Sequence, residues 1–284
     1  MNPSPLYRSV AGEQAVMALY DRVLAHWPVP YQALDIDTRH GRTFALASGP
    51  ASAPPLVLLH GACSNAVSWV GDVAEYSRCC RVYAVDLPGE PGRSAPNRPP
   101  WAGPAYTEWL EDLLGGLGIG TASLVGLSQG GWTACKFATH RPERVARLVL
   151  LAPGGIVPTR TSFLLRAVLL SMLGRRGAEA LNRHVFGGQP VHEEAVAFMD
   201  AIMTHFKARV GAEPLFTDEE LRRLTMPVLL VAGARDVVRP PEQMAARLRG
   251  LLPQLTVRIL PEMGHVLAHL APEVVPFLRA EGPM

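Results

Sequence analysis

Charge of one sign and long apolar runs are both scarce in this sequence. The 27 basic and 25 acidic residues leave a formal net charge of +2 and form no long run of either sign, which disfavours a nucleic-acid partner. The longest apolar segment, residues 163–173, is interrupted by Arg166 and is too short to span a bilayer. The first residues lack the apolar centre of a secretory signal peptide. We therefore expect a cytoplasmic protein that binds neither membrane nor nucleic acid.

Cysteine is also rare, and its spacing suits neither a metal site nor a disulfide. The four cysteines are Cys63, Cys79, Cys80 and Cys135. They lack the paired spacing of zinc sites, and the adjacent Cys79 and Cys80 make a shared disulfide awkward. Reduced thiols and no bound metal are the expectation.

Short apolar runs that alternate with helix-like segments dominate what is present. With 284 residues, 48% of them hydrophobic, the chain can bury a large core. Six nearly continuous apolar runs are typical of strands covered on both faces: 56–60, 80–86, 122–127, 145–152, 227–233 and 255–260. Helix-like segments lie between or after them: 105–118, 129–140, 240–250 and 265–280. The sequence therefore predicts an α/β fold with a mostly parallel central sheet and helices on both faces.

Two regions stand outside this alternation. Apolar residues spaced three and four apart predict a helix over residues 11–27, and two short alternating runs after it predict a hairpin around His40. Residues 155–217 have a helical period and no convincing strand. We expect three parts: an N-terminal helical arm at 1–30, a core made of 31–154 and 218–284, and an inserted helical segment at 155–217.

The stretch Gly126-Leu127-Ser128-Gln129-Gly130 lies where a predicted strand meets a predicted helix. The two glycines remove side chains that would obstruct a sharp turn, and such a turn lifts the serine hydroxyl above the sheet. The pattern alone is weak evidence, so its surroundings decide whether Ser128 is a nucleophile.

A serine nucleophile at neutral pH needs a base and a group that orients the base. His265 directly follows the last predicted strand, and Asp236 follows the strand before it. His269 is a rival base, although a surface or supporting role suits it better. The segment His60-Gly61-Ala62 ends the first predicted parallel strand. There the backbone N–H of Ala62 would join that of Gln129 to hold an oxyanion, and His60 would have a structural role.

These elements make the sequence resemble the α/β-hydrolase superfamily over roughly residues 32–281. The resemblance rests on the His-Gly-Ala segment, the loop at 86–94, the serine turn and the later aspartate and histidine, in family order. Within it, the chain is most similar to bacterial serine carboxylesterases that carry a helical cap. Two features depart from the family pattern: Glu90-Pro91 lengthens the loop after Asp86, and Leu270 stands where many members carry Glu.

The resemblance implies a serine hydrolase that cleaves small apolar carboxylic esters through an acyl-enzyme intermediate, with no cofactor and no metal. Ser128 would be the nucleophile, His265 the base and Asp236 the orienting acid. The helical segment at 155–217 would be a cap over Ser128, and its charges, mixed in sign, offer no clamp for a carboxylate or an amine. Candidates for lining an acyl pocket, for which core packing is an equal interpretation, are Trp69, Trp132, Met199, Met203 and Phe206.

Other functions remain open for the same residues. The same triad serves thioesterases, lactonases, C–C bond hydrolases and aminopeptidases, and hydrolase folds can also act as ligand receptors. A complete triad disfavours an inactive scaffold. We expect a small-molecule ester as the partner and leave the oligomeric state open.

Overall fold

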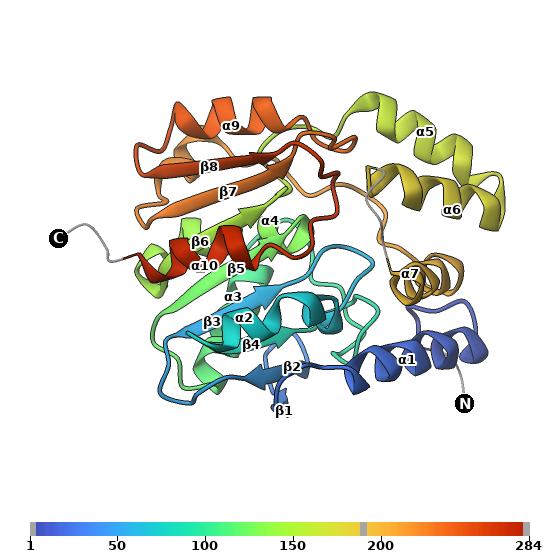
Figure 1. The fold of residues 1–284 in the computed structure, drawn as a ribbon, viewed down its shortest axis with the longest axis horizontal. Coiled ribbons are helices and arrows are strands. Elements are labelled where there is room, and N and C mark those ends of the chain that lie inside the picture. The colour runs from blue at the N-terminus through green and yellow to red at the C-terminus, as the bar shows by residue number, and fades with distance from the viewer. Residues whose placement is uncertain (1–3, 188–191, 281–284) are drawn as a thin grey trace.

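The computed structural model describes residues 4–187 and 192–280, in which helices cover both faces of an eight-stranded sheet (Figure 1). The strand order across the sheet is β1-β2-β4-β3-β5-β6-β7-β8. The strands are Tyr31–Ile36 (β1), Thr43–Ser48 (β2), Pro55–Leu59 (β3), Arg81–Val85 (β4), Ala122–Leu127 (β5), Val145–Leu151 (β6), Val228–Gly233 (β7) and Leu255–Leu260 (β8).

The strand directions confirm the predicted sheet. β1 and β2 form the expected antiparallel hairpin, with Tyr31 opposite Ser48, and β2 also pairs antiparallel with β4. Every other neighbouring pair is parallel. The carboxyl ends of β3 to β8 therefore meet along one edge, where side chains from distant parts of the chain come together.

Continuous apolar strands require two covering layers, because successive side chains of a strand point to opposite faces. In β3, Val57 and Leu59 belong to one buried cluster, and Leu56 and Leu58 belong to the other. The first cluster includes residues of α3 (Ala105–Gly116), α4 (Gln129–His140), α8 (Asp218–Arg222) and α9 (Pro241–Arg249). The second includes residues of α1 (Val10–Ala25), η1 (Ala66–Gly71), α2 (Val73–Ser77) and α10 (Ala271–Arg279).

The last helix begins later than the sequence predicted. We expected helical structure from residue 265, but α10 starts at Ala271, and both His265 and His269 lie in the loop before it. His269 has a φ of +55°, which no helix residue adopts, and Pro272 is in the first turn of α10, where proline is favoured. The apolar spacing of this loop resembled a helix because its residues pack against the core.

Three helices of the predicted insertion lie beside one end of the sheet (Figure 1). They are α5 (Thr161–Ser171), α6 (Gly174–Val185) and α7 (Glu193–His205), and residues 188–191 of this segment lie outside the described residues. Apolar side chains of α5, and Met172 directly after it, face solvent: Leu165 is 64% exposed, Leu169 65% and Met172 79%. The apolar composition of the insertion is thus only partly used in packing.

The N-terminal arm is joined to the end of α7. Tyr7 and Phe206 form an antiparallel bridge, in which Arg8 N–H donates to the His205 carbonyl (2.9 Å) and Lys207 N–H to the Leu6 carbonyl (2.8 Å). The Tyr7 and Phe206 rings meet edge to face at 5.6 Å. Helix α1 packs against α7 along the same contact (Figure 1). The arm and the insertion therefore pack against each other.

Two further expectations concern membranes and thiols. None of the helices in the described ranges is long and apolar enough to cross a membrane. All four cysteines are free, and the Sγ atoms of Cys79 and Cys80 lie 3.7 Å apart without a bond.

Candidate active site

Ser128 occupies a strained turn between β5 and α4. Its φ is +51°, a conformation that costs an L-residue on the order of 1 kcal/mol or more. A Cβ on Gly126 would lie 2.3 Å from the Gly130 carbonyl oxygen, and a Cβ on Gly130 would lie 2.1 Å from the Leu59 carbonyl oxygen. Both positions therefore require glycine. The turn holds the half-buried Ser128 side chain at the carboxyl ends of the strands.

Three predicted residues are brought into one hydrogen-bonded chain. Ser128 Oγ lies 3.1 Å from His265 Nε2, and His265 Nδ1 lies 2.8 Å from Asp236 Oδ2. Because a carboxylate accepts at Nδ1, the ring proton belongs there, and Nε2 is free to accept the serine proton. Burial alone would raise the pKa of Asp236, but the hydrogen bonds from His265, Arg239 N–H and Val238 N–H outweigh it, and the pKa is lowered. Asp236 is thus a buried carboxylate that orients the imidazole.

The loop that carries His265 is held by the insertion. His265 N–H donates to the Val185 carbonyl at the end of α6 (2.9 Å). A Cβ on Gly264 would lie 2.6 Å from that same carbonyl oxygen, so only glycine allows the two backbones to pack this closely. The insertion is therefore in direct contact with the segment that positions the imidazole.

His269, the rival base, lies elsewhere. Its ring fills the space left by the missing side chain of Gly71, where a Cβ would be 2.9 Å from the imidazole. Nearby, Asp72 accepts the Ala271 N–H at 2.8 Å. The structure thus brings His265, and not His269, to Ser128.

The predicted oxyanion donors lie on adjacent segments. A Cβ on Gly61 would be in ordinary contact, 3.6 Å, with the Ser128 Cβ, so the His60-Gly61-Ala62 segment passes directly beside the nucleophile turn. Neither the Ala62 N–H nor the Gln129 N–H has an acceptor in the part of the chain that the structure describes. Two free donors beside a serine are what an oxyanion requires.

His60 fixes the first of these segments, as expected. The Leu87 N–H donates to His60 Nε2 (2.9 Å), so Nδ1 carries the proton and donates to the Gly61 carbonyl (2.7 Å). Complete burial lowers the pKa of His60 to about 4, which keeps the ring neutral. The side chain therefore has a structural role.

Asp86 also has a structural role. Its carboxylate accepts hydrogen bonds from the Ala66 N–H (2.6 Å), the Arg93 N–H (2.7 Å) and the Tyr20 hydroxyl (3.2 Å). Burial raises its pKa to about 6 despite these bonds. Asp86 ties helix α1 and the loop at 86–94 to the end of β4.

Glu90 joins the two segments that carry the oxyanion donors. Its carboxylate accepts from the Cys63 N–H (2.8 Å) on one side and from the Gln129 side-chain amide (3.2 Å) on the other. Burial is the main reason that its pKa is raised to about 7. From the sequence, Glu90 was visible only as a departure in loop length, and nothing indicated that its side chain turns inward.

A buried arginine that the sequence did not single out contacts Ser128. Arg239 is 5% exposed, and its Nη1 donates to Ser128 Oγ at 3.0 Å and lies 3.4 Å from His265 Nε2. Its Nη2 pairs with Glu213 at 3.0 Å. The charges of the inserted segment alone did not reveal this pair, because Arg239 follows β7 and only Glu213 comes from that segment. In the sequence, Arg239 is the one charged residue in the apolar segment 237–241 that follows Asp236, and this was the signal that could have identified it.

Some of the candidate pocket residues serve packing. Trp132 contacts Trp101, Tyr106 and Phe216 in an aromatic cluster, with ring centroids 5.0 to 5.9 Å apart. Phe206 packs against Tyr7 in the N-terminal arm. Trp69 is buried, while Met199 and Met203 are half-buried. The interpretation of Trp132 and Phe206 as core residues is therefore the better one.

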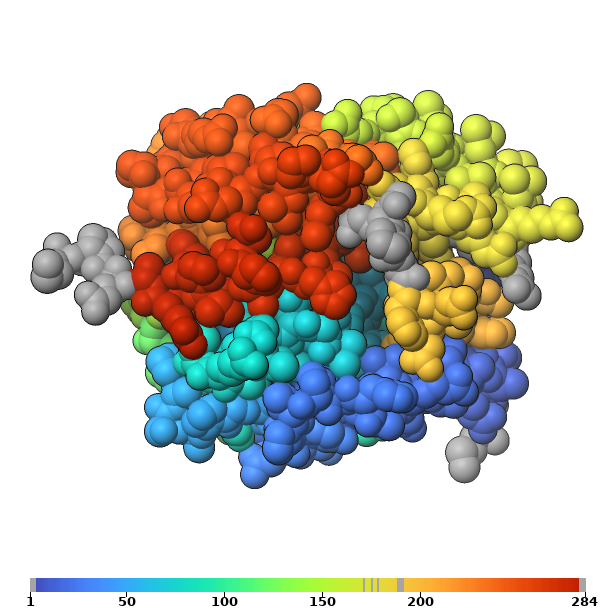
Figure 2. Space-filling model, viewed as in Figure 1, coloured from blue at the N-terminus to red at the C-terminus, as the bar shows by residue number. Residues whose placement is uncertain are grey.

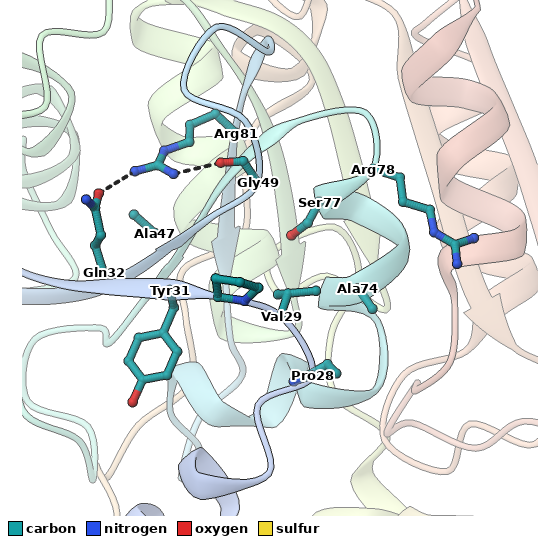
Figure 3. Close-up of a pocket in the computed structure, with 11 residues that line it drawn as sticks. Pro28, Val29, Tyr31, Gln32, Ala47, Gly49, Ala74, Ser77, Arg78 and Arg81 are labelled. Carbon is teal, nitrogen blue, oxygen red and sulfur yellow. Dashed lines mark hydrogen bonds between the residues drawn. The ribbon is translucent and has the colours of Figure 1, made fainter.

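The hollows of the surface are lined by different parts of the chain. One of about 650 Å³ is lined by the start of β1, the end of α2 and Arg81, which binds the Gly49 carbonyl and Gln32 (Figure 3). It holds none of the residues around Ser128. A second hollow is visible between the yellow and gold insertion and the red C-terminal segment (Figure 2). The hollow of about 650 Å³ is therefore not the candidate site.

The sequence and the fold both resemble known proteins. The model of the alpha/beta hydrolase family matches residues 56–275. Two relatives from Bacillus subtilis, the uncharacterized carboxylesterase nap and the carboxylesterase YbfK, are each 32% identical over 265 residues. The aligned region is 90% of this chain and 88% and 89% of theirs.

Two crystal structures from the same organism share the fold over nearly their whole length. Carboxylesterase CesB (YbfK) superimposes with a TM-score of 0.86 at 30% identity, covering 95% of this chain and 99% of the other. Naproxen esterase (carboxylesterase NP) gives the same score and identity and covers 94% and 98%.

Proposed function

Because this chain belongs to the alpha/beta hydrolase family, we propose that its carboxylic-ester hydrolase activity proceeds by acyl transfer to Ser128. Relatives that align with nine-tenths of the chain are named carboxylesterases, and the chain is a carboxylic-ester hydrolase like them. The observation that carries the role of Ser128 is the hydrogen-bonded chain from Ser128 through His265 to Asp236 at a strained turn.

Each step of the reaction has a residue to perform it. His265 Nε2 accepts the Ser128 proton while Oγ attacks the ester carbonyl, and the N–H groups of Ala62 and Gln129 stabilise the negative oxygen of the tetrahedral intermediate. When the intermediate collapses, the imidazolium gives its proton to the leaving alcohol. Water then attacks the acyl-enzyme with the same base, which releases the carboxylic acid and restores Ser128. Asp236 stabilises the imidazolium in both halves of the reaction.

We also propose that the helical insertion, residues 155–217, acts as a cap over this site. Two contacts support it: His265 N–H donates to the Val185 carbonyl of α6, and Glu213 reaches Arg239 beside Ser128. Because side chains of the insertion approach the nucleophile, the site has a wall on that side. Such a wall favours small substrates over the open surface of a lipid aggregate. We expect short- to medium-chain esters with an apolar acyl group.

The role of Ser128 is tested by labelling with a fluorophosphonate probe. Wild-type protein should be labelled at Ser128, and Ser128→Ala should lose both labelling and ester turnover while its thermal unfolding is unchanged. Labelling of the variant at another serine would overturn the assignment.

The reaction class is tested with a p-nitrophenyl ester series beside acyl thioesters and aminoacyl amides. Short and medium esters should give the highest kcat/KM. If kcat/KM for a thioester or an amide exceeds that of the best ester by about tenfold, which is about 1.4 kcal/mol of transition-state preference, the protein belongs to one of the other triad activities.

A further inference from the structure

The pair Arg239–Glu213 is built into the fold and is no accidental surface contact. Arg239 backbone N–H donates to Asp236 Oδ1 (2.9 Å), so the arginine belongs to the turn that holds the triad acid. The side chains of Arg239 and Glu213 are 6% and 11% exposed. Gly154 leaves room for the pair, since a Cβ there would crowd Glu213 at 3.0 Å and Arg239 at 3.2 Å.

The backbone that follows Glu213 is also anchored. Trp132 Nε1 donates to the Pro214 carbonyl (3.0 Å), and Phe216 N–H donates to the Gly155 carbonyl (2.8 Å). Glu213 therefore reaches Arg239 from a fixed segment. An ion pair positioned in this way holds the guanidinium beside Ser128.

The guanidinium lies on the side of the leaving alcohol. In acyl transfer, the leaving oxygen must approach His265 Nε2 to receive its proton while it is still bonded to the carbon attached to Ser128. Arg239 Nη1 is 3.0 Å from Ser128 Oγ and 3.4 Å from His265 Nε2, which is the position that this oxygen approaches. A bound ester therefore brings its alcohol portion against Arg239.

Arg239 also has donors to spare. Nη1 is directed to Ser128 Oγ and, more weakly at 3.5 Å, to the Ala152 carbonyl, while Nη2 takes Glu213. Nε–H has no acceptor among the residues that the structure describes. Nη1–H is therefore the donor that a bound ligand can take over from Ser128, and a carboxylate accepts it more strongly than a hydroxyl does, because both partners are then charged.

We propose that Arg239, held by Glu213, binds a carboxylate on the leaving alcohol, so that esters of hydroxy acids are preferred substrates. This proposal rests on acyl transfer to Ser128. The acyl side can remain apolar, as expected above, while the alcohol side carries the charge. The carboxylate would accept the Nη1–H that now points to Ser128, and this exchange would free Oγ for attack.

The test compares substrates that differ only in charge on the alcohol side. O-butyryl lactate and O-butyryl lactamide share their acyl group and shape, and hydrolysis is followed by proton release. Wild-type kcat/KM should favour the lactate ester by about tenfold or more, the size expected for a charge-assisted pair. Equal kcat/KM for the two esters would overturn the proposal.

The variants remove the Arg239–Glu213 ion pair without leaving a buried charge unpaired. Arg239→Gln combined with Glu213→Gln should abolish the preference for the lactate ester, since both members of the pair become neutral. Arg235→Gln, an exposed neighbour that pairs with Glu262, is the matched control and should keep the preference. Arg239→Lys is a second, more conservative variant; it should lose most of the preference because one ammonium cannot replace the two separate nitrogens that contact Glu213 and the carboxylate. A preference that survives in the double variant would overturn the proposal.

Two further substrate measurements distinguish a wrong carboxylate site from a wrong proposed function. Monoethyl succinate against ethyl succinamate places the carboxylate on the acyl side, and a preference there that depends on Arg239 would overturn the assignment to the alcohol side. Hydrolysis of p-nitrophenyl butyrate by wild-type protein tests acyl transfer itself. If this ester is cleaved and the lactate preference is absent, only the carboxylate site is wrong; if no ester is cleaved, the proposed function fails and this site with it.

Discussion

At the scale of single residues, Asp236 is the side chain whose loss should separate catalysis from stability. Its carboxylate fixes the Nδ1 proton of His265 at 2.8 Å and accepts the N–H groups of Val238 and Arg239. Asp236→Asn keeps the shape but can favour the wrong imidazole tautomer, and we expect kcat to fall by up to about 10⁴-fold with a nearly unchanged melting temperature. Steady-state kinetics with thermal unfolding checks both.

The matched control is His269→Ala in the same loop as His265. Its ring lies by Gly71 and Asp72, so the change should alter kcat far less than Asp236→Asn does. If kcat of His269→Ala fell as far, the base would have been assigned to the wrong histidine.

Glu90 should make stability depend on pH. Burial raises its pKa from 4.5 to about 7, so the folded protein binds this proton more tightly than the unfolded chain does. The stability that this proton binding contributes is complete below about pH 4.5 and is lost as pH rises through about 7. Glu90→Gln removes the titration, and its free energy of unfolding relative to wild type should rise across this window by a few kcal/mol.

Urea unfolding of both proteins between pH 4.5 and 8 measures this difference. Asp86 titrates in the same range, but its contribution is common to both proteins and cancels. A difference in unfolding free energy that stays constant with pH would show that Glu90 ionises as it does in water.

The residues with catalytic potential were predictable from the sequence to different degrees. Ser128, Asp236 and His265 could be found because each follows a recognisable strand, and parallel strands bring such positions to one edge. Arg239 and Glu213 could not be paired, because their contact depends on the path of residues 206–217, which form no helix and no named strand. The inward turn of Glu90 likewise depends on a loop conformation that apolar patterns do not encode.

At the scale of elements, two glycines in helices should respond oppositely to alanine. In α4, a Cβ on Gly130 would meet the backbone oxygen of Leu59 at 2.1 Å, so Gly130→Ala must displace β3 or the helix. We expect a loss of about 3 kcal/mol or more in unfolding free energy, at the upper end for overpacking. In α3, Gly115 is exposed with open space around it, and Gly115→Ala should stabilise by about 0.5–1 kcal/mol.

Chemical denaturation of the two variants checks this pair of signs. If Gly130→Ala left the free energy of unfolding unchanged, the turn at Ser128 would have space for a side chain that its distance to the Leu59 carbonyl excludes.

The element boundaries show where sequence patterns are strong and where they fail. Strand β5 and helix α4 begin and end where they were predicted, because an apolar run that ends at a glycine-containing turn marks the boundary between the two elements clearly. The start of α10 was missed by six residues, since the loop from His265 to Leu270 buries apolar side chains at helix-like spacing without being helical. Its conformation is set by the contact of His265 N–H with α6, which is tertiary and leaves no local signal.

At the scale of the whole molecule, the N-terminal arm and the insertion should open together. The bridge between Tyr7 and Phe206 joins chain segments almost 200 residues apart, and α1 packs along α7. Tyr7→Ala removes the ring contact, so amide hydrogen exchange should speed up both in residues 4–9 and in α7 while β5 and β6 stay protected. Exchange that speeds up in the arm alone would contradict this coupling.

Tyr7→Phe is the control for that experiment. The Tyr7 hydroxyl is buried and has no hydrogen-bond partner among the described residues, so its removal relieves an unpaired group and keeps the ring. Exchange in the arm and in α7 should then stay as slow as in the wild-type protein, or become slower.

The strained turn at residue 128 has a practical consequence for identifying natural ligands. The φ of +51° is imposed by Gly126, Gly130 and the packing of α4 on β3, and serine and alanine pay the same penalty for adopting it. Ser128→Ala should therefore keep the binding cleft in its native shape while it leaves the ester bond of a bound molecule intact. A protein of this kind works as a capture reagent: incubated with a cell extract and washed, it should retain uncleaved substrate, which mass spectrometry of the released small molecules can identify directly.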